Sequence, residues 1–515
     1  MISHKPHSRK GETQPFLSHL SQPITKTIRS AKFEHNGGIP LTFQRLLQTL
    51  NIKDSNNFDV ERQISGICSD SRQVKSGNVF VALRGQKSDG HHHVLSALRA
   101  GAIAVVGEER PPALPSHIPF LPVEDSRAAL ASLCDAFYGH PSSRLKLVGV
   151  TGTNGKTSTV HMLKHIFTLA GKTCESIGTL DGGLTTPDCE ELYRRLHEYA
   201  EDGCEYVFME VSSHALEWKK VSALRFALGI YTNLTGEHLD FHGDMRAYAK
   251  AKAKLFPLCV KSLFNADDPY VGEVSQGAGE AYTYSCGESS PFRALHARWS
   301  EKGGLQYDFL FPGGMTRIRC PLFGRFQVYN TLAALSASRL LGIDIEAAKS
   351  AVTVMPFVKG RLEKIDIGER DFSLYIDYAH TPDALEKVLK TLRETMGEGE
   401  KLILLFGCGG DRDRGKRRLM GQIASRYADV TVLTSDNSRS EDRREILNEI
   451  LRGIDKESAY TVIEDRKQAI EYCLSHAKAG HRILLAGKGH EEYEITAEGK
   501  KPFSERDIVR KYLEL

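Results

Sequence analysis

The chain has 515 residues, 41% of them hydrophobic, so at about 150 residues per domain its length predicts three domains with separate cores. Its 68 basic and 65 acidic side chains leave a net charge of +3, which argues against nucleic acid or an anionic membrane as the partner. No apolar run approaches the length of a transmembrane helix, so membrane insertion is not expected.

The cysteines and the N-terminal residues indicate the compartment. No two cysteines form a CxxC pair and no apolar signal segment begins the chain, so we expect free thiols in a reducing, cytoplasmic environment rather than disulfides or a zinc site. Residues 1–39 are polar and rich in Ser, His and Lys, which predicts a disordered extension, with a transit peptide as the less favoured alternative. The cysteines are Cys68, Cys134, Cys174, Cys189, Cys204, Cys259, Cys286, Cys320, Cys408 and Cys473.

Residues 40–144 are predicted to form a first α/β domain. Asn78–Leu83 has the β-branched and aromatic character of a strand. His93–Glu108 indicates a helix, a break at Gly101 and then a second strand. Pro141–Ser143 is a plausible linker to the next domain.

Residues 145–355 are predicted to form a second domain in which strands and helices alternate. Apolar runs at Leu145–Val150, Glu205–Val211 and Phe226–Asn233 predict strands, and residues 190–203 carry apolar side chains on one helical face. This alternation is typical of a parallel sheet with helices on both faces.

Residues 356–515 repeat the alternation and predict a smaller α/β domain. A helix is expected at Thr381–Met396. The expected strands are Phe372–Ala379, Lys401–Gly407, Asp429–Ser435 and Arg482–Gly487.

Val148–Phe167 contains a glycine loop between a predicted strand and a predicted helix. It ends in Gly155-Lys156-Thr157, as a phosphate-binding loop does, although Val150 stands where the strict pattern has glycine. Backbone N–H groups of such a loop bind phosphate oxygens, Lys156 would neutralise their charge, and the Thr157 hydroxyl would bind Mg²⁺. The alternative is a plain glycine turn.

Polar side chains follow the other two strands of this domain. Because ligands of an open α/β sheet gather at the carboxyl ends of its strands, we expect these side chains near the loop, where a carboxylate would suit Mg²⁺. On chemistry alone, the histidine at 238 is better explained as a hydrogen-bonded structural residue. The side chains are Glu210, Ser213, His214, Asn233 and His238.

Several segments together resemble the Mur ligase family, from about Leu41 to the C-terminus. They read TGTNGKTST, MEVSSHAL, TNLTGEHLDFHGDMRAYAKAKAKLF, YNTLAALSA, GRLE, DYAHTPDAL, FGCGGDRDRGKR and AGKGHE, in the family's order. The resemblance implies three α/β domains. A central, mostly parallel-sheet ATPase domain is flanked by an N-terminal UDP-binding domain and a C-terminal Rossmann-like domain. In that family Val150 is a regular feature of the loop.

The resemblance implies two Mg²⁺ ions and a modified lysine. Thr157 and Glu210 would hold one ion, and Glu210, His238 and Lys252 would be associated with the second, with Lys252 carbamylated. Carbamylation converts the amine into a carboxylate-like group. Lys156 joins Glu210, His238 and Lys252 in the implied catalytic set. Without the family register, Lys250, Lys252 and Lys254 would all be assigned to a solvated helix face.

The resemblance also nominates residues that bind ATP. Asn330 would contact adenine, Arg361 the γ-phosphate and Asp377 the ribose, so the C-terminal domain would close on the central one. The loop itself contributes Gly152, Thr153, Asn154, Gly155, Lys156, Thr157 and Ser158.

The uridine-nucleotide precursor would contact two further segments. Lys220 stands where the family usually has Arg, and Glu237 stands where it usually has Asp. The tract His91–His93 is interpreted as a surface loop rather than a metal site. The implied precursor contacts are Ser71, Thr185, Thr186, Ser213 and Lys220.

The C-terminal domain would select the incoming amino acid. Arg439 would pair with the distal carboxylate of meso-diaminopimelate, and Glu491 would accept from its distal ammonium. Ser438 replaces the usual Pro, which leaves the loop's shape open. The implied contacts are Arg412, Asp436, Asn437, Arg439, Gly487 and Glu491.

These residues together imply an ATP-dependent amide ligase of peptidoglycan synthesis, of the acid–amino-acid class. It would add meso-diaminopimelate to UDP-N-acetylmuramoyl-L-alanyl-D-glutamate through an acyl phosphate, as a cytoplasmic monomer serving cell wall biogenesis, cell shape and cell division. The alternatives are L-lysine or another diamino acid as substrate, a folylpolyglutamate synthetase-like ligase, and a nucleotide-dependent switch.

Overall fold

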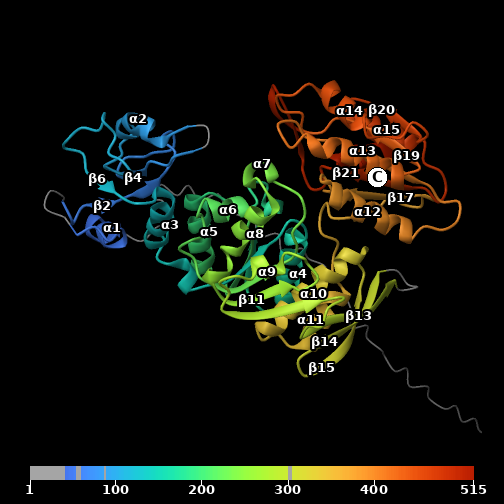
Figure 1. The fold of residues 1–515 in the computed structure, drawn as a ribbon, viewed down its shortest axis with the longest axis horizontal. Helices are drawn as coiled ribbons and strands as arrows, with labels where there is room; N and C mark the ends of the chain where they lie inside the picture. The colour runs from blue at the N-terminus through green and yellow to red at the C-terminus, as the bar shows by residue number, and fades with distance from the viewer. Residues whose placement is uncertain (1–40, 54–58, 86–87, 300–303, 515) are drawn as a thin grey trace, which may run out of the picture. The chain divides into compact units, whose positions relative to one another are not determined.

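The computed structural model of the protein describes residues 41–53, 59–85, 88–299 and 304–514 (Figure 1). The extension predicted at 1–39 lies outside these residues. No helix among those described is long and apolar enough to cross a membrane. All ten cysteines are free.

The first part of the described chain contains a small parallel sheet with strand order β3-β4-β5-β6. The strand predicted at 78–83 and the helix–turn–strand predicted at 93–108 are confirmed as β4, α2 and β5, and Pro141–Ser143 is a 3₁₀ turn. The elements are β1 (Leu41–Thr42), α1 (Phe43–Thr49), β2 (Gln63–Ile64), β3 (Gly66–Cys68), β4 (Asn78–Val81), α2 (Val94–Arg99), β5 (Ala104–Gly107), β6 (Phe120–Pro122) and α3 (Ser126–Phe137).

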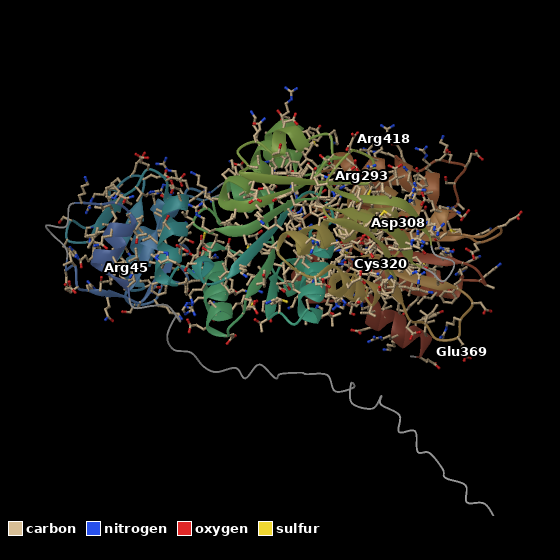
Figure 2. All side chains as sticks on the ribbon, turned by 90° about the horizontal axis from the view of Figure 1, so that it is seen from below. Arg45, Arg293, Asp308, Cys320, Glu369 and Arg418 are labelled. Carbon is tan, nitrogen blue, oxygen red and sulfur yellow. The ribbon has the colours of Figure 1, made fainter. Side chains whose placement is uncertain are left out.

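A nine-stranded sheet follows, with order β15-β14-β13-β12-β11-β10-β7-β9-β8. Neighbouring strands from β8 through β13 are parallel, as predicted, but β13, β14 and β15 pair antiparallel. Arg293, Asp308 and Cys320 mark these last three strands in Figure 2. The strands are β7 (Lys146–Thr151), β8 (Cys174–Ile177), β9 (Tyr206–Glu210), β10 (Phe226–Tyr231), β11 (Cys259–Asn265), β12 (Glu280–Ser285), β13 (Phe292–Trp299), β14 (Leu305–Phe311) and β15 (Gly314–Cys320).

Helices cover both faces of this sheet. Successive residues of a strand point to opposite faces, and Leu147 packs in one apolar cluster while Val148 packs in another. The first cluster contains Leu192 of α5, and the second contains Leu163 of α4. The helices are α4 (Lys156–Leu169), α5 (Cys189–Glu201), α6 (Ser213–Glu217), α7 (Leu239–His242), α8 (Met245–Ala253), α9 (Val271–Val274), α10 (Arg325–Leu340) and α11 (Ile345–Thr353).

A second sheet, with order β16-β17-β21-β18-β19-β20, forms the last part of the chain. Its strands are parallel except β16, and all four predicted strands are confirmed as β17, β18, β19 and β21. The strands are β16 (Glu363–Ile365), β17 (Ser373–Asp377), β18 (Leu402–Phe406), β19 (Val430–Leu433), β20 (Tyr460–Val462) and β21 (Arg482–Ala486), with a separate hairpin of β22 (Tyr493–Thr496) and β23 (Gly499–Pro502).

Two helical layers enclose this sheet. Leu404 and Ile403, adjacent on the fully buried β18, belong to different apolar clusters. The Leu404 cluster includes side chains of α12, α13 and α14, and the Ile403 cluster includes those of α15 and α16. The helices are α12 (Pro382–Glu394), α13 (Gly415–Tyr427), α14 (Arg443–Leu451), α15 (Arg466–Ser475) and α16 (Glu505–Leu513).

Candidate active site

The glycine loop connects β7 to α4, the strand–loop–helix context expected of a phosphate-binding loop. Gly152 and Gly155 have φ angles of 150° and 88°, which favour glycine. A Cβ at Gly155 would lie 2.5 Å from Oδ1 of Asn330, whose Nδ2 donates to Gln327 at 2.9 Å. The structure therefore packs Asn330 against the loop.

Lys156 begins α4, and its amine folds back over the loop. Nζ donates to the carbonyl oxygens of Gly152 and Thr153, both at 2.8 Å. Burial lowers the pKa of Lys156, although the carboxylates of Glu210 and Glu237 act in the opposite direction. The amine is thereby held beside the N-terminus of α4, where the helix dipole and free N–H groups attract anions.

Glu210 ends β9 and is 1% exposed. Thr157 donates its hydroxyl to Oε2 at 3.0 Å. Thr179 donates its N–H to Oε1 at 2.8 Å and its hydroxyl to Oε2 at 3.2 Å. A Cβ at Gly178 would lie 2.3 Å from Oε1, so the carboxylate sits directly against that backbone.

Arg361 reaches the same cluster from the last part of the chain. Its Nη2 donates to the Thr157 hydroxyl at 2.9 Å, and its guanidinium carbon lies 4.5 Å from the ring centroid of Tyr378. Asp377 is buried and accepts from the N–H groups of Leu362 and Ala379, while burial raises its pKa to about 6. Asp377 thus supports the turn that carries Arg361.

The other strand-end residues surround the loop. Asn233 Oδ1 accepts from the N–H of Asn154 at 3.0 Å. His238 has a left-handed backbone, its ring lies 4.9 Å from that of His214, and burial lowers its pKa to about 4. Glu237 lies between His238 and His380, with Oε1 3.9 Å and 3.4 Å from their Nε2 atoms.

Lys252 differs from its two neighbours on α8. It is 1% exposed, whereas Lys250 and Lys254 are exposed and Lys254 pairs with Glu217 at 2.6 Å. Nζ of Lys252 lies 4.4 Å from the ring centroid of Tyr248 and forms no ion pair with any described residue. Burial, with the charge of Lys156, lowers the pKa of Lys252 well below the usual value.

This donor set suits a hard divalent cation. Glu210 and Thr157 offer oxygen atoms, which Mg²⁺ prefers, and a buried lysine that becomes anionic would add a third oxygen donor. No group of three or more His, Cys, Asp or Glu side chains among the described residues could hold a metal by itself.

The predicted precursor contacts lie on two parts of the chain. Thr186 donates to the carbonyl oxygen of Glu210 at 2.9 Å, and Ser213 is hydrogen-bonded to His242 at 2.9 Å. Lys220 is 7% exposed, and its Nζ lies 2.7 Å from Asp188. Thr185 is hydrogen-bonded to Thr179 at 3.4 Å. Thr185 and Thr186 therefore join the Glu210 cluster, and Lys220 is connected to it by donating to the carbonyl oxygen of Thr186 at 3.5 Å.

Ser71 is the exception among them. It is half-buried on the turn after β3 and forms no hydrogen bond with the Glu210 cluster among the described residues. Ser69, two residues earlier, donates its hydroxyl to Glu190 of α5 at 2.6 Å. In the histidine tract, Nδ1 of His91 is hydrogen-bonded to Asp89 at 2.6 Å, and Nε2 is buried without a hydrogen-bond partner among the described residues.

The predicted amino-acid contacts form a second cluster. Asn437 donates from Nδ2 to Glu491 at 2.8 Å, and its Oδ1 accepts from Nζ of Lys488 at 3.0 Å. Burial and the charge of Asp436 raise the pKa of Glu491. A Cβ at Gly487 would lie 2.6 Å from Oδ2 of Asp436, so only glycine fits there.

Arg439 adds a cation to this cluster. It has a φ of 52°, and its Nη1 donates to the carbonyl oxygen of Gly410 at 2.8 Å. Burial and neighbouring Arg412 lower the pKa of Arg439. Arg412 is exposed, and a Cβ at Gly409 would touch both arginine side chains. The guanidinium groups of Arg412 and Arg439 and the half-buried carboxyl group of Glu491 are thus available to a ligand that carries both charges.

Several residues of both clusters were missed at the sequence level. Thr179 donates to Glu210, which lies 31 residues later in the sequence, and no motif around Thr179 indicates this contact. Lys488 is 0% exposed and lies in the AGKGHE segment, where a lysine between two glycines could have been noticed. His380, in DYAHTPDAL, contacts Glu237.

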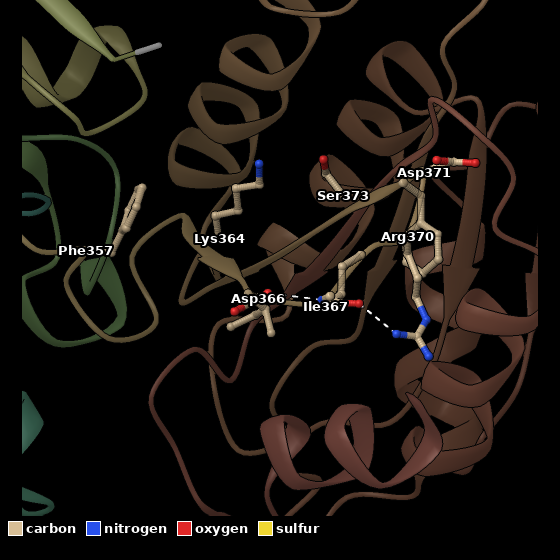
Figure 3. A pocket seen from close by; sticks show the side chains of 10 residues that line it. Phe357, Lys364, Asp366, Ile367, Arg370, Asp371 and Ser373 are labelled. Carbon is tan, nitrogen blue, oxygen red and sulfur yellow. Dashed lines mark hydrogen bonds between the residues drawn. The ribbon is translucent and has the colours of Figure 1, made fainter. Parts of the chain in front are cut away.

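A pocket elsewhere in the last part of the chain is not the site (Figure 3). It is lined from Lys364 to Ser373, with Phe357, at the amino end of β17. Asp377 and Gly487 lie at the opposite, carboxyl ends of β17 and β21, where α/β sheets bind ligands.

Three family models match the chain. The model described as Mur ligase family, catalytic domain matches residues 63–138, the Mur ligase middle domain matches 150–338, and the Mur ligase glutamate ligase domain matches 360–489.

Individual proteins match nearly the whole chain. A protein of Caldanaerobacter subterraneus subsp. tengcongensis named UDP-N-acetylmuramoyl-L-alanyl-D-glutamate--2,6-diaminopimelate ligase is 40% identical over 474 residues, 90% of this chain and 96% of that protein. A protein of the same name from Clostridioides difficile is 39% identical over 482 residues, 91% of this chain and 98% of that protein.

Solved structures match as well. A structure of a ligase with that name covers 92% of this chain and 99% of its own, with a TM-score of 0.64 and 30% identity. A folylpolyglutamate synthase of Mycobacterium tuberculosis covers 75% of this chain and 95% of its own, with a TM-score of 0.60 but 16% identity, which shows a shared fold alone.

Proposed function

Since this chain belongs to the Mur ligase family, we propose that it is an ATP-dependent ligase that joins meso-diaminopimelate to UDP-N-acetylmuramoyl-L-alanyl-D-glutamate. The observation that carries this proposal is the cluster of Arg439, Asn437 and Glu491, which offers opposite charges to one ligand. We propose three domains, at 40–144, 145–355 and 356–515, for the precursor, ATP and the amino acid.

The first chemical step activates a carboxylate. The γ-carboxylate of the D-glutamyl residue attacks the γ-phosphorus of ATP, and ADP leaves, giving an acyl phosphate. Lys156 and Arg361 would neutralise charge on the moving phosphoryl group, because both contact residues of the glycine loop. Asn330 would border the adenine, since it packs against Gly155.

Glu210, Thr157 and carbamylated Lys252, with His238 beside them, would hold Mg²⁺. When bound, the ion supplies Lewis-acid stabilisation of phosphate charge. Two features of the chain support this site. Thr179 fixes both carboxylate oxygens of Glu210, and burial lowers the pKa of the Lys252 amine, which favours the unprotonated form that reacts with CO₂.

The second step forms the amide bond. The amine of the diamino acid attacks the acyl phosphate carbonyl, the tetrahedral intermediate loses phosphate, and the amine proton passes to solvent or phosphate. No side-chain nucleophile takes part, so positioning of the two substrates carries this step. Arg439 would bind the distal carboxylate, and Glu491, joined to Asn437, would accept from the distal ammonium.

L-Lysine lacks the distal carboxylate and would leave Arg439 without an anionic partner. Such an unpaired charge discriminates strongly between near-identical ligands, which favours meso-diaminopimelate. A folylpolyglutamate ligase shares the fold, but the similarity at 16% identity carries no substrate argument. A nucleotide switch would need neither the Arg439 cluster nor the Thr186 and Ser213 contacts.

We further propose that the enzyme acts as a cytoplasmic monomer in peptidoglycan synthesis, and so contributes to cell wall biogenesis, cell shape and cell division. The test is phosphate release with ATP, the UDP-linked precursor and a panel of diamino acids. Release must require both co-substrates. Release from ATP that is independent of either one would refute the ligase function.

A further inference from the structure

Arg466 and Glu505 form an ion pair in the interior of the last part of the chain, where the proposed mechanism uses neither. Their side chains are each 1% exposed. Oε1 of Glu505 accepts a hydrogen bond from Nε of Arg466 at 2.9 Å and lies 2.8 Å from Nη2. Burial of such a pair is unfavourable unless further hydrogen bonds satisfy it, so its partners indicate its purpose.

The guanidinium of Arg466 spans two strand ends. Nη1 donates to the carbonyl oxygen of Ser435, after β19, at 3.1 Å, and Nη2 donates to that of Ala486, at the end of β21, at 2.8 Å. In the sheet order β18 separates these two strands, so the guanidinium joins the ends of strands that are not direct neighbours. The next residues, Asp436 and Gly487, belong to the proposed amino-acid pocket.

Helix α16 holds this bridge from behind the sheet. Glu505 is its first residue, and the adjacent Arg506 donates from Nη1 to the carbonyl oxygen of Gly489 at 3.1 Å. The charge of Arg466 also acts on Asp436. Burial alone would raise the pKa of Asp436, but the charges of Lys488 and Arg466 outweigh it, and the pKa is lowered. The planar guanidinium of Arg466, with its five donors, therefore fixes the residues directly before Asp436 and Gly487 and also lowers the pKa of Asp436.

We propose that Arg466, held by Glu505 of the C-terminal helix, is a positioning residue that sets the spacing of Asp436 and Gly487 and thereby the selection of the diamino acid. The inference rests on the proposed function. The substitution Arg466→Lys keeps the positive charge but replaces the planar guanidinium with a compact ammonium group. A single nitrogen cannot donate to Ser435, Ala486 and Glu505 in the same geometry.

Arg370 supplies a matched control, because it anchors the other end of the same helix. Nη2 donates to the carbonyl oxygen of Leu513 at 2.7 Å and Nη1 to that of Ile367 at 2.8 Å, beside the pocket at the amino end of β17 (Figure 3). Arg370→Met thus loosens α16 without touching the strand ends that carry the substrate cluster.

The experiment compares the wild type with Arg466→Lys, Glu505→Gln and Arg370→Met in the full chain. KM is measured for meso-diaminopimelate at saturating ATP and precursor, then for ATP, together with the midpoint of urea unfolding. We expect Arg466→Lys and Glu505→Gln to raise the KM for the diamino acid about tenfold or more, because small displacements of binding groups are costly. The KM for ATP changes less than about twofold, and discrimination against L-lysine falls.

Arg370→Met is expected to lower the unfolding midpoint while leaving the KM for the diamino acid unchanged. The inference is overturned if Arg466→Lys lowers the midpoint but keeps the wild-type KM and selectivity, or if Arg370→Met raises that KM equally. A wild-type enzyme that releases phosphate without need of a diamino acid refutes the proposed function itself, which is a separate result.

Discussion

The hydroxyl of Thr157 donates a hydrogen bond to the carboxylate of Glu210 at 3.0 Å and accepts one from Arg361 at 2.9 Å. The last residue of β9 is thereby joined to the first turn of α4 and to a cation from the last part of the chain. Each of the three groups has a role in the proposed phosphoryl transfer, so these two hydrogen bonds are the most direct point at which to test the site.

Glu210→Gln is expected to lower phosphate release by about 100-fold or more, because it removes the anionic oxygen that would bind Mg²⁺ while keeping the side chain's shape. Binding of the UDP-linked precursor, measured by calorimetry, should persist. The control is Glu205→Gln just before β9, where Glu205 pairs only with Lys172 at 3.1 Å. Equal activity of the two variants would contradict the role of Glu210.

Lys252→Ala is expected to abolish ligation, and short carboxylic acids added to the assay should restore part of it by occupying the place of the carbamate. Lys250→Ala, two residues earlier on the exposed face of α8, should behave as the wild type. Wild-type activity should also fall in CO₂-depleted buffer. A Lys252→Ala enzyme that keeps full activity would remove Lys252 from the site.

Arg439→Ala is expected to lower kcat/KM for meso-diaminopimelate by about a thousandfold, since a charged carboxylate loses its partner, and to affect L-lysine far less. Arg443→Ala provides the control, because Arg443 lies on α14 and pairs with Glu494 at 3.1 Å. If Arg439→Ala leaves the ratio of kcat/KM for meso-diaminopimelate to kcat/KM for L-lysine unchanged, the proposed basis of selectivity is wrong.

His490 predicts a dependence of stability on pH. Burial lowers its pKa from 6.5 to about 4, and the cations Arg361, Lys359 and Arg506, with His380, act in the same direction. The unfolded chain therefore takes up a proton near pH 6.5, whereas the folded chain does so only near pH 4. Its contribution to stability is complete above pH 6.5 and is lost as the pH falls toward 4.

Between pH 7 and pH 4 the free energy of unfolding should fall by about 1–3 kcal/mol less in His490→Gln than in the wild type. The measurement is urea unfolding of the variant and the wild type across that range. His476→Gln, at an exposed histidine, should leave the slope unchanged. If the free energies of unfolding of His490→Gln and the wild type change in parallel with pH, His490 has the same pKa in the folded and unfolded chain and the prediction is wrong.

The sequence analysis missed the parallel strands β8, β11 and β12 but predicted others, because a buried parallel strand can be a continuous apolar run. β18, with five consecutive buried residues, is the plainest example. The antiparallel strands β14 and β15 were missed. β15 alternates exposed Arg317 and Arg319 with buried Ile318 and Cys320, which leaves no apolar run to notice.

The candidate site was predicted unevenly for a similar reason. The loop from Gly152 to Ser158 is a local pattern, and the structure places it as expected. Thr179 and Lys488 act through contacts that arise only when distant segments fold together. Spacing alone could not choose Lys252 among three lysines, because burial of that one side chain depends on what packs against α8.

Gly178 has an extended backbone that any residue could adopt, yet a methyl group there would collide with Oε1 of Glu210 at 2.3 Å. Glycine is therefore required at this position for steric reasons and not for its backbone conformation. A Gly178→Ala enzyme should imitate a Glu210 variant, and Glu210→Asp, with its shorter side chain, should act as its genetic suppressor. A substitution at either position would then be tolerated only with a matching change at the other, so the two residues act as one steric unit.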